Sequence, residues 1–306
     1  RLSLSVAFDL AVADLSLGFG AEALEILDVV DPEDPRTPAF KAIGAILEDQ
    51  PIRSTNPFWG QIECRGGYVI WEVLSRATAS RLDEEHLRSI QLHFLELPKQ
   101  LRRRIGPDLG VKLAEAGDVE VAQVIRNSLV RAESDEFSAL RRLDVSMALK
   151  ADDLGSALRH LEQLVLGNTA DSPQALLRLF EAYAENDISP PEKMAALLSS
   201  YRFELQGTAI GQDLALREIE VAIDRDQLAE AMDLIAGFEG DERALSHQEV
   251  EAIFDHALTS TNDILFARLV LSKRQTLERR SIAPELFRAV LSRLIEANFI
   301  VVAEQI

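Results

Sequence analysis

The chain has 306 residues, of which 47% are apolar and 27% are charged, so it can bury a large core and global disorder is excluded. Its net charge of −19 argues against the basic face that a nucleic-acid-binding protein needs to neutralise phosphates. An acidic surface favours solubility and basic partners instead.

Two further features limit the class of protein. Cys64 is the only cysteine, so an intrachain disulfide is excluded. No apolar run approaches the ~20 residues of a membrane-spanning helix.

The sequence opens at Arg1 rather than at methionine, so we expect a processed chain or a piece of a longer one, from which any targeting segment has been removed. The compartment stays open between cytoplasm and periplasm.

Helix signals run along the chain, whereas strand signals are nearly absent. Thr37-Pro38 and Ser172-Pro173 each place a capping hydroxyl before a proline at the first helical position. The strings Ser189–Glu192 and Ser246–Glu249 fit a capping box. The arginine triplet at 102–104 is expected on a solvated helix face. These signals predict an all-α chain of short helices, which must pack on their neighbours to be stable.

One pattern recurs along the chain: a polar turn is followed by a helix with a small residue at its fifth position. Six copies are recognisable, at Phe19–Ala23, Asp118–Ala122, Asp153–Ala157, Gln227–Ala231, Asp263–Ala267 and Phe299–Ala303. Ala122 and Ala157 are 35 residues apart, and the last three alanines follow each other at intervals of 36. The gap of 74 residues between Ala157 and Ala231 holds two periods, with a weak copy near Met194.

This spacing predicts a repeated pair of antiparallel helices, because one helix pair occupies about 34–36 residues in arrays of this kind. Alanine suits the point where two helices cross near their turn. It lets the axes approach closely without the backbone cost of glycine.

These residues resemble the tetratricopeptide repeat superfamily. Phe40–Leu47 matches the family's first helix, in which an aliphatic-small pair lies between large residues. In the second helix the family has an alanine with large residues four and seven positions later, often followed by a proline at plus twelve. Three copies match this second-helix pattern: Ala23 with Leu27, Val30 and Pro35; Ala157 with Leu161 and Leu164; Ala231 with Ile235 and Phe238.

The chain also departs from the family pattern. Arg126 stands four positions after Ala122, and no copy is recognisable between Gln50 and Tyr68, so the resemblance covers about two thirds of the chain. It implies a right-handed superhelical α-solenoid with a concave groove that binds peptides or helices. The string Gly211–Glu218 is also similar to helical periplasmic motility proteins of α-proteobacteria, which would imply a bacterial envelope or motility assembly.

An irregular segment divides the chain. We expect N-terminal helix pairs over residues 1–50, an aromatic-rich joint over 51–72 and the main repeat array over 73–306. The joint holds both tryptophans of the chain. Aromatic residues with a polar atom are favoured at binding hot spots, and they also pack cores, so both interpretations stay open. The candidate partner-binding residues are Phe58, Trp59, Tyr68 and Trp71.

No catalytic, cofactor or metal site is predicted. His86 and His93 are seven residues apart, whereas a metal pair on a helix prefers a spacing of three or four with a third ligand. Cys64 is expected to be a buried cysteine rather than a nucleophile. Gly66-Gly67 lacks the Gly-Lys-Ser/Thr of a phosphate loop and is interpreted as a helix break.

The sequence therefore predicts a non-catalytic scaffold, adaptor or chaperone that binds a protein, helix or peptide partner, and the acidic surface favours a basic one. The alternative is the helical support domain of a larger enzyme whose catalytic domain is absent here.

The sixth copy stops at Ile306 without the polar cap helix that usually ends a solenoid. We expect that the native chain continues, or that a partner or a second copy covers this end by self-association. The alternative is that Phe299 to Ile306 fold back onto the preceding helix pair.

Overall fold

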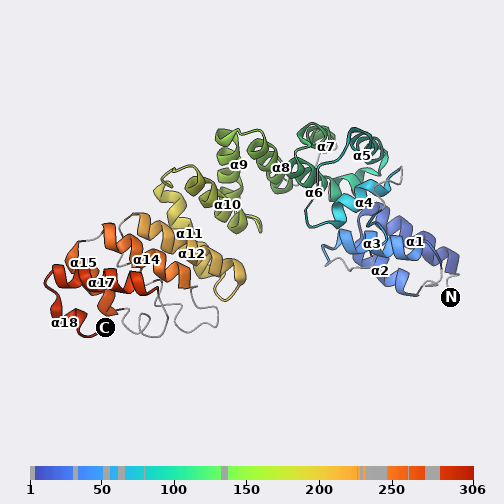
Figure 1. The fold of residues 1–306 in the computed structure, drawn as a ribbon. Helices are drawn as coiled ribbons and strands as arrows, with labels where there is room; N and C mark the ends of the chain where they lie inside the picture. The colour runs from blue at the N-terminus through green and yellow to red at the C-terminus, as the bar shows by residue number, and fades with distance from the viewer. Residues whose placement is uncertain are drawn as a thin grey trace. The chain divides into compact units, whose positions relative to one another are not determined.

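A computed structural model describes residues 4–29, 34–50, 56–60, 66–78, 80–131, 137–225, 227, 230–231, 234, 247–260, 262–272 and 283–306. These residues form sixteen helices and no strand (Figure 1). The predicted all-α class is therefore confirmed for the part of the chain that the structure describes. By its internal packing the chain divides into two compact units, Arg1–Ala175 and Leu176–Ile306, with the division inside α10 (Ser172–Glu185).

Unit 1 contains the first nine helices, and consecutive helices pack on one another, as α1 does on α2, α6 on α7 and α8 on α9. Their bounds are α1 Leu4–Leu17, α2 Gly20–Val29, α3 Thr37–Leu47, α4 Tyr68–Ser75, α5 Glu84–Glu96, α6 Lys99–Ala116, α7 Val119–Arg131, α8 Phe137–Lys150 and α9 Leu154–Leu166.

Unit 2 contains the remaining helices after α10, and α11 packs on α12, α14 on α17, and α18 on both α15 and α17. Their bounds are α11 Glu192–Glu204, α12 Ala209–Asp224, α14 His247–Ser260, α15 Asp263–Ser272, α17 Pro284–Glu296 and α18 Ile300–Ala303.

The recurring alanine marks buried positions, as the repeat predicts. Five of the six are buried, and Ala303 is half-buried: the five are Ala23, Ala122, Ala157, Ala231 and Ala267. Helices α2, α7, α9, α15 and α18 begin within one residue of the predicted start of a copy. Because a buried alanine leaves no room for a larger side chain, the period of about 36 residues reflects close helix packing.

The longest helix of unit 1, α6, packs on α1, α4, α7 and α8. It contains two buried glycines at its contacts. A Cβ at Gly106 would lie 2.8 Å from the Leu129 side chain of α7, and one at Gly110 would lie 2.8 Å from Leu143 of α8. Pro107 lies between them inside the helix, where it removes a backbone donor. These small residues let α7 and α8 approach α6 closely.

Several predicted helix caps are wrong. Thr37 is the first residue of α3 rather than its cap. The capping box at Ser189–Glu192 is not formed, because α11 begins at Glu192 after Pro191 and has no side-chain cap. The Ser172 hydroxyl donates to the Leu164 carbonyl at 2.7 Å and accepts from the Thr169 amide at 2.9 Å. It therefore joins the start of α10 to the end of α9.

The caps that do form use other residues. Asp83, Asp153 and Thr208 each accept a hydrogen bond from the backbone amide three positions later. Of these, only Asp153 belongs to a predicted copy of the repeat. Ser246 lies outside the described residues, so the capping box predicted there has no structural counterpart to compare.

The arginine triplet of α6 is not a solvated face, which corrects that prediction. All three arginines are half-buried. Arg102 donates to the buried Ser128 hydroxyl of α7 at 3.2 Å, and Arg104 donates to the backbone carbonyl of Leu47 at the end of α3. The cations therefore join helices, since guanidinium donors can satisfy backbone and hydroxyl acceptors at helix contacts.

The string Gly211–Glu218 lies in the first two thirds of α12, and its first and last residues both contact α11 or the turn before α12. A Cβ at Gly211 would overlap the backbone carbonyl oxygen of Leu205. The Glu218 carboxylate is buried, accepts a hydrogen bond from the Ser199 hydroxyl, and pairs with Arg202 at 2.5 Å. These contacts fix α11 against α12.

The last eight residues fold partly back onto unit 2. Phe299, Val302 and Ile306 are half-buried against its core, whereas Val301 is exposed. The predicted folding back of residues 299–306 onto the preceding helix pair is therefore confirmed only in part, because Phe299 and Val302 are half-buried and Val301 is not.

Candidate partner-binding site

Within the joint, residues 56–60 form a tight turn. The Asn56 side-chain oxygen accepts a hydrogen bond from the Phe58 amide at 2.9 Å, and the Asn56 carbonyl accepts one from the Trp59 amide at 3.3 Å. Pro57 supplies the fixed φ of a turn, and Gly60 has φ +77°, a conformation that favours glycine. The turn buries Phe58 and leaves Trp59 41% exposed.

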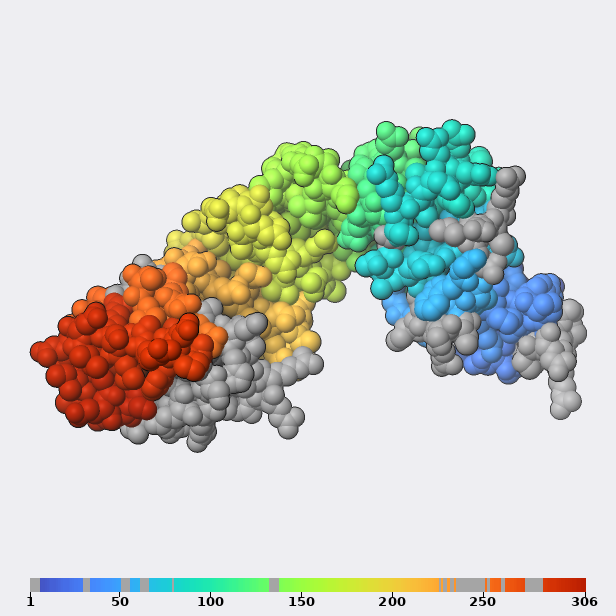
Figure 2. All heavy atoms as spheres, in the orientation of Figure 1, coloured from blue at the N-terminus to red at the C-terminus, as the bar shows by residue number. Residues whose placement is uncertain are grey.

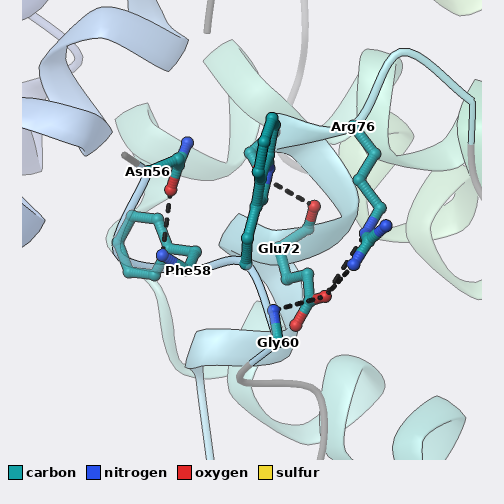
Figure 3. A network of polar contacts seen from close by, with 7 residues as sticks. Asn56, Phe58, Gly60, Glu72 and Arg76 are labelled. Carbon is teal, nitrogen blue, oxygen red and sulfur yellow. Dashed lines mark hydrogen bonds and ion pairs between the residues drawn. The ribbon is translucent and has the colours of Figure 1, made fainter. Parts of the chain in front are cut away.

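The turn is held against α4 by a buried carboxylate. Oε1 of Glu72 accepts a hydrogen bond from the Gly60 amide at 3.3 Å and bonds from Arg76 Nη2 and Nε at 2.5 and 3.2 Å (Figure 3). Oε2 is buried and has no hydrogen-bond partner among the residues that the structure describes. A buried carboxylate is stable only when it is paired, so Arg76 and Gly60 together keep Glu72 in place.

A second chain of hydrogen bonds orients the indole. Nε1 of Trp59 donates to Ser75 Oγ at 3.1 Å, and Ser75 Oγ donates to the Glu72 carbonyl at 2.8 Å. The Trp59 ring therefore has a fixed direction although two fifths of its surface is accessible. A rigid and accessible aromatic side chain loses little conformational entropy when a partner binds.

The other aromatic rings of the joint form a cluster around Phe58. Its ring lies 6.4 Å from Trp71 in a stacked arrangement and 6.1 Å from Tyr68. Phe58 and Trp71 are buried, whereas Tyr68 is 53% exposed. The structure thus brings all four predicted residues together and divides them into two core residues and two accessible ones. Phe58 and Trp71 therefore pack in the core of unit 1, and contact with a partner stays a prediction for Trp59 and Tyr68.

Two clefts of unit 1 border the joint. The smaller has a volume of about 430 Å³ and is lined mainly by apolar and aromatic residues, among them Phe40, Phe58, Tyr68 and Trp71. The larger has a volume of about 640 Å³ and is lined by Trp59 together with the ends of α3 and α4 and one face of α6. Volumes of this size accommodate bulky side chains of a partner.

The wall of the larger cleft carries alternating charges from α6. Arg104 donates to the Leu47 carbonyl and lies 3.5 Å from the Asp49 carboxylate. Lys112 donates to the carbonyls of Arg76 and Ala77, the latter at 3.4 Å. The two cations thus satisfy backbone acceptors just after α4 and at the end of α3, where the helix dipole is negative.

Asp108 lies between these cations, one helical turn from each. Burial raises the pKa of the Asp108 carboxyl above its ordinary value, although the Arg142 guanidinium, 3.5 Å away, acts in the opposite direction. Burial also lowers the pKa of the Lys112 ammonium. The cleft wall therefore combines ring surface with charges that are already paired, which suits apolar recognition better than capture of a free ion.

The remaining candidates give no second site. His86 pairs with Asp83 at 2.6 Å, and His93 Nδ1 lies 2.8 Å from the Ser89 carbonyl. Within the described residues no group of three or more His, Cys, Asp or Glu side chains is arranged to hold a metal ion. None of the helices described there combines the length and apolar character that crossing a bilayer requires. Cys64 lies outside the described residues.

The sequence reasoning missed Glu72, although a signal was present. It is the only charged residue of α4, whose sequence is otherwise apolar, aromatic or serine. A lone carboxylate in such a helix indicates a buried ion pair or a functional group.

No protein-family model, curated protein or solved structure matches the chain.

Proposed function

We propose that this protein is a non-catalytic scaffold with a superhelical tetratricopeptide-like array, and that it binds a helix or extended peptide of a protein partner across the aromatic joint. In this proposal one anchor side chain of the partner enters each cleft. Trp59 contacts the anchor in the larger cleft, and Tyr68 contacts the anchor in the smaller one. The repeat of buried alanines supports the array.

One observation carries the binding site: two accessible aromatic residues, Trp59 and Tyr68, line adjacent clefts and are backed by two buried ones. Binding energy at protein interfaces concentrates on a few such residues, with Trp and Tyr over-represented. The hydrogen bond from Trp59 to Ser75 supplies the rigidity that makes an aromatic side chain an effective anchor.

The test is quantitative affinity purification with the full chain from its native cells. We expect a specific partner to be enriched by the wild type and to fall at least about tenfold in the Trp59→Ala/Tyr68→Ala variant, since two anchors are removed. Circular dichroism checks that both proteins are equally helical.

The matched control is Phe203→Ala, which removes an exposed aromatic ring from α11. It should retain the partner. If the double variant keeps the same partners at the same yield as the wild type, the joint is not the binding site.

A further inference from the structure

Helix α1 is apolar on two opposite faces. Phe8, Ala11 and Leu15 face the core of unit 1 and are buried. A second stripe consists of Val6, Leu10, Ala13 and Leu17, which follow each other at intervals of four, three and four residues. A helix advances about 100° per residue, so these four positions lie within about 60° of one another and opposite the buried face.

The second stripe is exposed. Val6, Leu10 and Leu17 are 46%, 44% and 51% accessible, although α1 packs on α2, α3 and α6 through its other sides. The N-terminal helices lie at the surface of unit 1, as the blue spheres of Figure 2 show. A surface helix normally carries charged and polar residues at the centre of its outer face, and a helix that is apolar all round is normally covered.

The charged side chains of α1 and α2 have one sign, although the Arg36 guanidinium, 4.0 Å from the centroid of the Phe8 ring, attracts Asp9 from outside these helices. Asp9 borders the stripe on one side and Asp14 on the other. Helices α1 and α2 together contain no Lys, Arg or His, and they contain five acids: Asp9, Asp14, Glu22, Glu25 and Asp28. Of these, Asp28 is paired with Lys41 of α3 at 2.7 Å.

We propose that the outer face of α1 binds a basic amphipathic helix of a partner protein. The partner helix has apolar residues at positions i, i+3 or i+4 and i+7, which pack on Leu10, Ala13 and Leu17. Lysines or arginines at its flanks lie against Asp9 and Asp14. This is a helix-on-helix interaction of the amphipathic type, with the register and orientation set by complementary charge.

Asp9 and Asp14 favour a basic partner helix over the two other occupants of an apolar face, a second copy of α1 and a membrane surface. A second copy of α1 would place acid against acid, and like charges facing each other oppose such a pair. An anionic membrane surface repels the same carboxylates, because bilayer-binding helices carry Lys and Arg at their borders. None of the four stripe residues lines either cleft, although Phe8 on the opposite face of α1 contacts Phe40 of the smaller cleft, with ring centroids 5.3 Å apart. The proposal therefore holds or fails independently of the joint.

The probe is a pair of labelled model peptides of about 16 residues, long enough to cover the 14 residues of α1. Both have leucine at the apolar positions. One has lysine at the flanks and the other has glutamate. With the full-length chain, fluorescence anisotropy should show saturable binding of the lysine peptide only, and the affinity should fall as salt is added.

Two variants locate the contact. Leu10→Gln/Leu17→Gln should weaken binding of the lysine peptide at least about tenfold, since it removes the centre of the stripe. Asp9→Asn/Asp14→Asn should weaken it several-fold and reduce its salt dependence. The matched control is Leu92→Gln/Leu95→Gln, which makes the same change at two exposed leucines of α5 and should bind as the wild type does.

The proposal is overturned if the two peptides bind equally, if the α1 variants bind as the control does, or if the lysine peptide does not bind at about 1 mM. Light scattering that shows a dimer of the full chain, dissociated by Leu10→Gln/Leu17→Gln, would assign the face to a second copy. Binding to phosphatidylserine vesicles that this variant abolishes would assign it to a lipid surface.

Discussion

The backbone amide of Gly60 donates a hydrogen bond to the buried carboxylate of Glu72 at 3.3 Å. The contact joins the turn that carries Trp59 to the helix that carries Trp71. Both tryptophans of the chain therefore lie next to one carboxylate, and tryptophan fluorescence, excited selectively over tyrosine, reports on the joint.

Replacing Glu72 with alanine should destabilise the joint. The change leaves the Gly60 amide and the Arg76 guanidinium without their acceptor, which we expect to cost about 1–3 kcal/mol in the free energy of unfolding. Glu72→Gln keeps a neutral acceptor and loses only the ion pair with the half-exposed Arg76. This variant should therefore lower the free energy of unfolding by less than about 1 kcal/mol. Urea unfolding followed by tryptophan fluorescence measures both. The control is Glu84→Gln on α5, which removes an exposed ion pair with Arg88 at 3.5 Å. It should change the free energy of unfolding by less than about 0.5 kcal/mol.

The two tryptophans should differ in accessibility. In Trp71→Phe the remaining Trp59 is 41% exposed, so acrylamide should quench its emission efficiently. In Trp59→Phe the remaining Trp71 is buried and should be quenched weakly, with emission at shorter wavelength. Equal quenching in the two variants would contradict the division of the joint into core and accessible rings.

Ala157→Leu should destabilise unit 1 by about 1–3 kcal/mol, because a fully buried alanine on α9 has no space for three more carbon atoms. Ala184→Leu on α10 makes the same change at an exposed helical position and should shift stability by less than about 0.5 kcal/mol. Thermal or urea unfolding compares them. Equal stability of the two variants would be incompatible with the helix crossing placed at Ala157.

Gly211→Ala and Gly155→Ala should change stability in opposite directions. Alanine normally stabilises a helix relative to glycine, and a Cβ at Gly155 would meet only Asp153 Oδ1, at an ordinary contact distance of 3.8 Å, so we expect a gain of about 0.4–1 kcal/mol there. At Gly211 the new Cβ overlaps the Leu205 carbonyl, which should cost about 1–3 kcal/mol. A gain at both positions would show that the α11–α12 turn relaxes easily.

The raised pKa of Asp108 has a defined consequence for stability. A carboxyl whose pKa is higher in the folded than in the unfolded protein stabilises the fold below its unfolded pKa, and this contribution is lost as the pH rises through the folded pKa. Asp108→Asn should therefore be more stable than the wild type near pH 7, and the difference should shrink as the pH falls toward about 4. Unfolding curves across this range measure it.

Asp153→Asn supplies the opposite comparison. Hydrogen bonds from the Ser156 side chain and backbone lower the pKa of the Asp153 carboxyl. Its contribution is present above the unfolded pKa and is lost as the pH falls through the folded one. The two variants should thus differ in the sign of their pH dependence. Parallel curves would show that burial does not control Asp108.

The helical class and the buried alanines were predictable because both follow from local spacing in the sequence. The aromatic cluster was predictable as a set, since four large rings within fourteen positions rarely separate in a fold. Which rings are accessible was not predictable. It depends on how the turn at Asn56–Gly60 is held against α4, through the hydrogen bonds from Gly60 to Glu72 and from Trp59 to Ser75, which join residues 12 and 16 positions apart.

The failures have physical causes as well. A serine or threonine before proline predicts a cap only if its hydroxyl has no better partner, and Ser172 finds one in the carbonyl of Leu164. Three consecutive arginines predict a solvated face unless neighbouring helices present unsatisfied acceptors, as α3 does at Leu47. The exposed stripe of α1 was not predicted, because a helix with apolar residues on two opposite faces has the sequence pattern of a uniformly apolar helix.

The two cations of α6 also impose an order on events at the ribosome. The acceptor of Arg104 is the carbonyl of Leu47, 57 residues earlier, and that of Lys112 is the carbonyl of Arg76, 36 residues earlier. At about 5–20 residues per second, the end of α3 waits about 3–11 s for its partner to be synthesised. During that interval water solvates the Leu47 carbonyl, and α3 packs on α1 and α2, which are synthesised before it. Slow codons between α3 and α6 would lengthen this exposed stage, and a chaperone that binds nascent apolar helices would act at this stage.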